Sequence, residues 1–319
     1  MKGKKIIAAV LAVLICAFCC PTAAFAKSGE YVTVGGFAIG LELNIDGVAV
    51  VDVNEKTCKD FCVGDIIKKV GGEKVNDLES LKSAVRGAGN NFTAEVLRDG
   101  KTVTVTAKKD RTGALGITVR DSLRGLGTVT YVKADNTFAS LGHPVGSTKA
   151  KAPLAISGGS TSSAIVLGVN KGEKGKAGEL KAVFVEKDEL RGKIISNTNF
   201  GVYGKLEKAV KNPLYEKKVK IASRDEVALG KATILSTVDG KTVREYDIEI
   251  VSKASQNKPE EKGLVIRVVD KDLLEKTGGI VQGMSGSPIM QNGKLVGAVT
   301  HVFLNDSTRG YGIFAEFMG

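Results

Sequence analysis

The sequence contains no tryptophan, only six prolines and only two histidines among its 319 residues. Three of its five cysteines fall within the first 26 residues, which leaves Cys58 and Cys62 in the remainder of the chain. So few histidines and cysteines argue against a zinc site with several protein ligands, and we expect neither a metal nor a cofactor. A redox C-x-x-C motif is absent beyond the first 26 residues. Cys58 and Cys62 could form a disulfide in an oxidising compartment, but two small buried residues are the interpretation that we favour.

Glycine and short apolar runs are what the chain has in abundance, with 39 glycines and 43% hydrophobic residues. A glycine-rich chain with few aromatic residues is typical of many short strands and tight turns, and this length suggests two domains. The net charge is +11, from 46 basic and 35 acidic residues. Without the first 26 residues, which hold three lysines and no acidic residue, the charge is +8, and this suits an anionic membrane surface or an acidic partner. Lysine and glutamate interleave throughout and no aromatic-basic motif occurs, so we expect no nucleic-acid partner.

The first 26 residues have the layout of an export signal. Lys2, Lys4 and Lys5 precede an uncharged run over residues 6–20, and the small-residue site Ala24-Phe25-Ala26 follows. The run is about 15 residues long, shorter than the ~20 that a membrane-spanning helix needs. We therefore expect a signal peptide over residues 1–26 that is cleaved, with an uncleaved membrane tether as the alternative, and a chain that is exported across the cytoplasmic membrane.

Residues 30–110 are predicted to form one small α+β unit. A glycine-rich loop at residues 35–40 enters an alternating strand, and residues 66–70 form a second strand-like run. Asp77 is placed to cap a helix whose apolar residues recur with helical spacing. The pair Asp99-Gly100 lies between two strand-like runs, which predicts a hairpin.

The order of loop, strand, VGDIIKKVGGEKV and helix resembles a PDZ domain over about 80 residues. In such a domain the glycine-rich loop presents backbone N–H groups to a peptide carboxylate, and the peptide adds as a strand beside the helix. The resemblance implies that the ligand is a peptide or protein C-terminus, held between the 39–43 edge and the 77–86 helix. The alternative is a PDZ-like fold used only for packing. The implied peptide-binding loop consists of Gly36, Phe37, Ala38, Ile39 and Gly40.

Residues 112–319 contain many strand-like runs and few long helices. Turns are expected at Asp239-Gly240 and Asn292-Gly293. Regularly spaced short strands with such turns are typical of a β-barrel or sandwich. The predicted fold is therefore mainly β, with an α+β unit at 30–110 followed by a barrel at 112–319.

The most informative motif is Gly283-Met284-Ser285-Gly286-Ser287-Pro288. A Gly-x-Ser-Gly-x-Pro loop between β elements is what a trypsin-like serine peptidase uses for its nucleophile. Gly283 permits a backbone twist that aims the N–H groups of Gly283 and Ser285 at one point, which would form an oxyanion hole. Ser287 stands where the Gly-x-Ser-x-Gly elbow has its last glycine, so that elbow is excluded. The alternative is a glycine-serine loop without chemistry.

A serine nucleophile needs a base, and the chain offers two histidines. His143 lies in Ser-Leu-Gly-His-Pro, far upstream of Ser285, whereas His301 alternates within an apolar strand. In two-barrel serine peptidases the first barrel supplies the base and the second supplies the serine. We therefore favour His143 as the base and interpret His301 as a structural histidine.

The third member of a triad should orient the base and stabilise its charged form. Asp270 ends the apolar run 264–269 and is a reasonable geometric choice, although helix capping would equally explain it. The sequence leaves six aspartates open: Asp188, Asp225, Asp239, Asp247, Asp270 and Asp272.

One family resemblance covers nearly the whole chain after the signal. The stretch KTGGIVQGMSGSPIMQNGKLVGAVTHVFLNDSTRGYGIFAEFM, the upstream SLGH and the preceding PDZ-like unit closely resemble the stage IV sporulation protein B serine peptidases of endospore-forming bacteria. The resemblance implies a triad of His143 in SLGH, Asp270 in RVVDKDLL and Ser285 in GMSGSP. The choice of Asp270 rests mainly on this resemblance.

The same resemblance implies a role in sporulation signalling. Such a peptidase is exported into the space between forespore and mother cell and cleaves an extracytoplasmic part of a membrane-bound regulator. That cleavage releases an intramembrane protease, which processes a sigma-factor precursor. The PDZ unit is implied in substrate targeting and in self-cleavage near the N-terminus. The alternative function is a non-catalytic peptide-binding adaptor with a degenerate peptidase fold.

Overall fold

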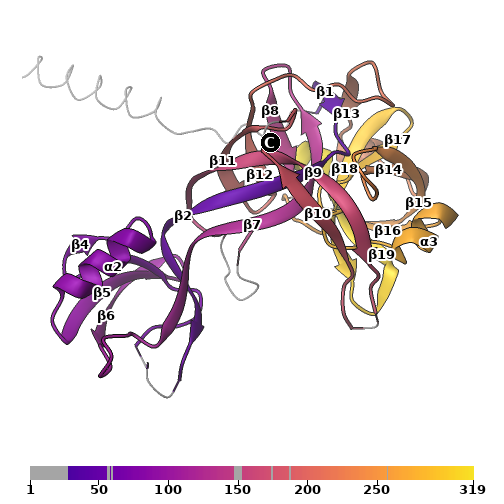
Figure 1. The fold of residues 1–319 in the computed structure, drawn as a ribbon. Coiled ribbons are helices and arrows are strands. Elements are labelled where there is room, and N and C mark those ends of the chain that lie inside the picture. Colours follow the sequence, from indigo (N-terminus) through magenta and orange to yellow (C-terminus); the bar gives the residue numbers. More distant parts are fainter. Residues whose placement is uncertain are drawn as a thin grey trace, which may run out of the picture.

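A computed structural model describes residues 28–55, 58, 60–146, 153–173, 175–186, 188–256 and 258–319. The expected signal peptide at 1–26 lies outside these residues. Within the described ranges, no helix has the length and apolar character needed to cross a bilayer. The described strands form two barrels and a smaller lobe, which Figure 1 shows on the opposite side from α3.

Six strands close into a first barrel, because each pairs with the next and the last pairs with the first. Around the ring these are β2 (Ala38–Val53), β9 (Ile156–Asn170), β11 (Gly192–Thr198), β12 (Gly201–Leu206), β8 (Thr137–Ser140) and β7 (Ile117–Val132). β10 (Glu179–Val185) pairs with the outer part of β9. Ile39, Leu41 and Leu43 alternate along β2, so all three face one core, where they join Phe138 and Ile194.

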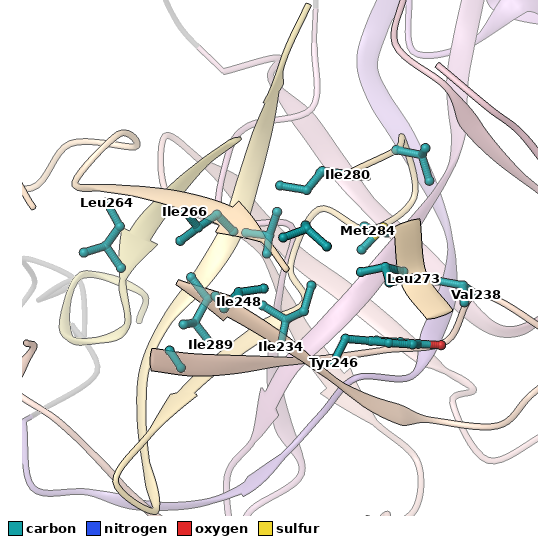
Figure 2. Close-up of a cluster of buried hydrophobic side chains, with 14 of the residues drawn as sticks. Ile234, Val238, Tyr246, Ile248, Leu264, Ile266, Leu273, Ile280, Met284 and Ile289 are labelled. Atoms are coloured by element: carbon teal, nitrogen blue, oxygen red, sulfur yellow. The ribbon is translucent and has the colours of Figure 1, made fainter. Parts of the chain in front are cut away.

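Six further strands close a second barrel in the same way. Around the ring these are β14 (Gly230–Ser236), β15 (Arg244–Lys253), β16 (Leu264–Val268), β19 (Asp306–Phe314), β18 (Lys294–Phe303) and β17 (Pro288–Gln291). Figure 2 shows Ile234, Ile248, Ile266 and Ile289 gathered in its core. The helix α3 (Lys271–Thr277) covers one side with Leu273, and ends at Gly278, which has a φ of +73°.

The two barrels share a third cluster of buried side chains. β1 (Tyr31–Val34) pairs with β7 of the first barrel and with β13 (Val219–Ile221), which in turn runs parallel to β18 of the second. Val32, Val34, Tyr131 and Leu295 belong to this cluster. Two short 3₁₀ turns complete this part, η1 (Arg224–Glu226) and η2 (Ala315–Phe317). The barrels therefore pack as one body around the start of the described chain.

The smaller lobe is an insertion within the first barrel. Its own elements are β3 (Ile66–Val70), β4 (Glu73–Lys74), α2 (Leu78–Gly87), β5 (Asn91–Arg98) and β6 (Lys101–Lys108). β2 and β7 are each 16 residues long and run from the barrel into the lobe, where Val50 pairs with Val119 (Figure 1). The lobe has a separate core, which extends from Val48 to Val119.

The predicted fold class is confirmed, since the chain is mainly β with a small α+β unit and barrel strands. The predicted helix that Asp77 caps and the Asp99-Gly100 hairpin are also present. The strands divide the chain differently from the predicted boundary, because residues 31–45 belong to the first barrel rather than to the 30–110 unit. The apolar alternation continues through β2 without a break, so the sequence does not mark where the strand leaves one core for the other. Cys58 is buried and Cys62 is exposed, and both are free thiols.

Candidate active site

Ser285 lies where the two barrels meet, in the loop between α3 and β17. Its Oγ donates a hydrogen bond of 2.9 Å to the carbonyl of Thr300, on β18 of the second barrel. Its own carbonyl accepts from the amide of Thr128, on β7 of the first barrel, also at 2.9 Å. The serine is therefore held from both sides of the junction.

The loop around Ser285 is folded tightly by two glycines. Gly283 and Gly286 have φ values of +98° and +93°, in the left-handed region that favours glycine. The hydroxyls of Thr128 and Thr130 donate to the carbonyls of Gly283 and Gly286, both at 2.8 Å. One strand of the first barrel thus fixes the Ser285 loop of the second.

The amides of Gly283 and Ser285 have no hydrogen-bond acceptor within the described residues, whereas those of Met284, Gly286 and Ser287 are all bonded to backbone carbonyls. Buried loops normally satisfy their amides, so two free amides on either side of Met284 form an available donor pair. Such a pair can stabilise an oxyanion. These are the two amides that the sequence analysis predicts as an oxyanion hole.

His143 follows β8 of the first barrel, after a left-handed turn at Leu141 and Gly142 with φ values of +69° and +71°. This turn touches the Ser285 loop, since a Cβ on Gly286 would lie 2.5 Å from the amide nitrogen of Leu141. Nδ1 of His143 is 2.9 Å from the carbonyl oxygen of Pro144. A carbonyl only accepts, so Nδ1 carries the proton and Nε2 keeps its lone pair. Burial lowers the pKa of His143 against the raising effect of that bond, which favours the neutral, basic imidazole.

Asn197 on β11 clamps the chain that follows His143, a role that our sequence reasoning missed. Its Oδ1 accepts from the amide of Val145 at 2.8 Å. Its Nδ2 donates to the carbonyls of Val145 and Leu154, at 2.7 and 3.0 Å. Both ends of the 145–154 segment are therefore tied to one side chain, and no sequence motif signals such a clamp.

His301 lies against His143 instead of standing apart as a structural residue. The two ring centroids are 4.8 Å apart and the ring planes are inclined by 38°. Nε2 of His301 is 3.8 Å from Oε2 of Glu261. Burial, followed by the charges of His143 and Lys262, lowers the pKa of His301 to about 4. The alternating apolar strand around His301 predicted a structural histidine, so the sequence did not indicate its contact with His143.

Asp270 is not brought to His143. Its side chain caps α3 by accepting from the amide of Leu273 at 2.9 Å, and it also accepts from the amide of Asp247 at 3.3 Å. Within the described ranges, none of the six candidate aspartates forms an ion pair with His143. The structure therefore gathers the loops of His143 and Ser285 and leaves Asp270 in the capping role that the sequence also allowed.

The loop from Gly36 to Gly40 lies in the first barrel and is not placed to bind a peptide. Gly36 donates to the carbonyl of Val129 at 2.8 Å and accepts from the hydroxyl of Thr237 at 2.9 Å. Both edges of the 39–43 strand are already paired, with β7 on one side and β9 on the other. A peptide cannot add to an occupied edge, so the assignment of Gly36, Phe37, Ala38, Ile39 and Gly40 as a peptide-binding loop is corrected.

A free edge of the kind expected of a PDZ domain occurs elsewhere in the lobe. β7 pairs with β2 over residues 117–120 on one side only. α2 lies near this strand, with the amide of Leu78 donating to Oδ2 of Asp121 at 3.1 Å. The turn before the strand reads Gly-Ala-Leu-Gly-Ile, and in the described residues the amides of Leu115 and Gly116 have no acceptor. The glycine-containing loop, strand and helix are thus present, but the loop and strand follow the helix in the chain.

Two family models match the chain, SpoIVB peptidase S55 over residues 111–318 and a PDZ domain over residues 35–108. The chain belongs to the SpoIVB peptidase S55 family. The S55 match begins in the turn before β7 and continues through the second barrel, so it includes both His143 and Ser285. No curated protein matches the chain. The family predicted from the sequence is therefore confirmed, and with it a serine peptidase of the sporulation type that carries a PDZ domain.

Proposed function

We propose that this SpoIVB peptidase S55 chain is a serine endopeptidase with Ser285 as nucleophile and His143 as general base. The observation that carries the proposal is the junction of the barrels, where the Ser285 loop touches the His143 turn and leaves two amides free. The other function considered, a peptide-binding adaptor, gives no physical reason to keep a half-buried histidine of lowered pKa beside such a loop.

The chemistry follows from the atoms at this junction. Nε2 of His143 takes the proton of the Ser285 hydroxyl, and the freed Oγ attacks the peptide carbonyl. The amides of Gly283 and Ser285 stabilise the oxyanion. His143 then passes the proton to the leaving amine, and water hydrolyses the acyl-enzyme. In the structure the hydroxyl donates to Thr300, so it must turn toward His143 when substrate is present.

The substrate that we propose is an extracytoplasmic region of a membrane-bound regulator of an intramembrane protease. Cleavage would release that protease to process a sigma-factor precursor. The chain would act after export, in the space between forespore and mother cell, and would also trim itself near its N-terminus. Family membership supports this role, and residues 27–319, which lack Lys2, Lys4 and Lys5, carry a net charge of +8 that suits work near an anionic membrane surface.

The experiment compares purified residues 27–319 with a Ser285→Ala variant, each incubated alone and with an extracytoplasmic fragment of a candidate regulator. Products are identified by mass spectrometry. We expect defined fragments from the parent and none from the variant. Equal cleavage by both proteins would show that Ser285 is not the nucleophile. Binding of the fragment without cleavage by either would favour the adaptor.

We place the peptide-binding site of the PDZ lobe between β7 and α2. A peptide would add to the free 117–120 edge of β7, with its terminal carboxylate at the free amides of Leu115 and Gly116. Fluorescence anisotropy with peptides of defined C-termini tests this site. Val85→Lys on the half-buried face of α2 should abolish binding, whereas Lys101→Ala on exposed β6 should leave it unchanged. Equal binding by both variants would place the site elsewhere.

A further inference from the structure

The two amides proposed as an oxyanion hole can act only if both N–H groups point to the place where the oxyanion forms. The N–H of Gly283 belongs to the peptide group between Gln282 and Gly283, which is trans, since the described residues contain no cis peptide bond. In a planar trans peptide the C=O and the N–H point in opposite directions. A group that holds the carbonyl of Gln282 therefore also fixes the direction of the Gly283 N–H.

The strand β10 holds that carbonyl. The amide of Leu180 donates to the carbonyl of Gln282 at 2.9 Å, and the amide of Gln282 donates to the carbonyl of Gly178 at 2.8 Å. These two bonds make a parallel bridge between Glu179 and Gln282. The peptide that precedes Gly283 is thus joined to β10, and the Gly283 N–H points away from that strand.

The side chain of Leu180 fills the space beside Gly283. An ideal Cβ on Gly283 would lie 3.1 and 3.2 Å from Cδ1 and Cβ of Leu180, and 2.9 Å from Cδ2 of Leu126 on β7. Leu180 is 7% exposed and belongs to the core cluster that also contains Val281 and Met284. Because such interiors are closely packed, the two leucines oppose a rotation of the peptide before Gly283.

The hairpin of β9 and β10 is itself attached to the second barrel. Val166 on β9 exchanges two backbone hydrogen bonds of 2.9 Å with Gly240, which lies between β14 and β15. The amide of Gly175, in the segment that joins β9 to β10, donates to the carbonyl of Leu304 at 2.9 Å. Along the hairpin, the bridge to Gln282 lies between these two attachments. The first barrel therefore places a fixed strand beside the Ser285 loop.

We propose that Leu180 is a positioning residue for the oxyanion hole, with its amide orienting the N–H of Gly283 and its side chain keeping that orientation. This inference rests on the proposed peptidase function. Leu180 touches none of the reacting atoms and acts through Gly283. Without its side chain the 282–283 peptide can turn, which withdraws one of the two donors to the oxyanion. His143 keeps its tautomer, because that is set by the Pro144 carbonyl.

The first test is the rate at which a fluorophosphonate labels Ser285, since the phosphoryl oxygen of this probe needs the same two amides. Leu180→Ala should label more slowly than the parent by about tenfold or more. Leu180→Ile keeps the side-chain volume and should recover most of the rate. The midpoint of the acid limb of the pH profile should stay the same in both variants, because it depends on His143. A shifted midpoint would place the defect at the base and overturn the inference.

A cleaved fragment provides the second readout. Leu180→Ala should lower kcat by about tenfold or more with little change in KM, because the hole acts in the transition state. Leu264→Ala is the matched control, since Leu264 is a buried leucine of the same cluster that lies beside Gly297 and Gly312. It should lower the unfolding temperature as Leu180→Ala does and should label Ser285 at the parent rate.

If Leu180→Ala does not fold, Leu180→Val takes its place, with a smaller loss of the same kind. Labelling of Leu180→Ala at the parent rate, or an equal loss in Leu264→Ala, would overturn the inference. A folded parent that neither labels at Ser285 nor cleaves the fragment would instead overturn the proposed function.

Discussion

At Gly286 the loop that carries Ser285 comes close to the backbone of the first barrel. A Cβ there would collide with the carbonyl of Thr128 and lie 2.5 Å from the nitrogen of Leu141, at a φ of +93°. Gly293, in the turn between β17 and β18, has a φ of +70° but nothing within 4 Å of its ideal Cβ. A comparison of Gly286 with Gly293 therefore separates the cost of backbone strain from the cost of steric crowding.

We expect Gly286→Ala to destabilise the protein by about 2–4 kcal/mol and to abolish Ser285 labelling, because strain and overpacking add. Gly293→Ala should cost only about 1 kcal/mol, from strain alone. Urea unfolding and probe labelling measure both effects. An equal decrease in the free energy of unfolding in the two variants would show that the close contacts at Gly286 do not contribute to the effect.

The two histidines also predict how stability depends on pH. Burial lowers the pKa of His143, and it lowers that of His301 to about 4, so the unfolded chain binds protons more readily than the folded one below a pH of about 6.5. The free energy of unfolding should therefore fall as the pH falls from about 7 to 4. His301→Phe should flatten this dependence, and urea unfolding across that range measures it. An unchanged slope in the variant would contradict the assignment to His301.

At the scale of elements, the segment after His143 depends on a clamp from another strand. Asn197→Ala would remove three hydrogen bonds and leave the half-buried carbonyls of Val145 and Leu154 without this partner. We expect a cost of about 1–2 kcal/mol and at least a tenfold slower labelling of Ser285, because the base loses its position.

Asn170→Ala is the matched control, since Asn170 makes one exposed bond of 2.8 Å to Glu179 on β10. It should change neither stability nor labelling measurably. Hydrogen exchange at the amide of Val145 should rise in Asn197→Ala alone. If both variants label Ser285 at the parent rate, the clamp does not position His143.

The whole molecule is a two-barrel body with a lobe inserted through β2 and β7. β7 begins at the free edge of the lobe and, toward its other end, carries Thr128 and Thr130, which hold the Ser285 loop. None of the buried residues that form the two barrel cores lies between residues 46 and 120, and the lobe meets the barrel in a small cluster in which Ala49 and Ile66 join Ile45. The lobe should therefore be removable.

Asn44 and Ser122 are partners across β2 and β7, so a two-residue Asn-Gly turn can join the strands in place of residues 46–120. We expect the shortened chain to fold, to label at Ser285 and to bind no peptide. Circular dichroism, labelling and anisotropy check these outcomes in one preparation. A chain that fails to fold would show that the barrels depend on the lobe.

Local patterns in the sequence determined much of this protein. Alternation over short runs predicted most strands, Asp77 predicted a helix start, and Gly283 to Pro288 predicted the nucleophile loop, because each depends on neighbours within a few residues. The mainly β class followed from the same patterns, whereas the family followed from a resemblance that covers nearly the whole chain after the signal. Tertiary structure alone decided which strands pass from the barrel core to the lobe core, because the apolar alternation of a strand is the same in both cores.

The surroundings of the candidate base were likewise decided by contacts between distant segments. His301 lies against His143, Glu261 lies against His301, and Asn197 holds the segment that follows His143. These residues come from different strands and loops, and no spacing in the chain predicts that they meet. Asp270 is the opposite case. The sequence allowed it to be either a triad member or a helix cap, and the structure shows that it caps α3. Short sequence motifs identify the residues that are able to act as nucleophile or base. Which of these residues come into contact depends on how the barrels close and pack.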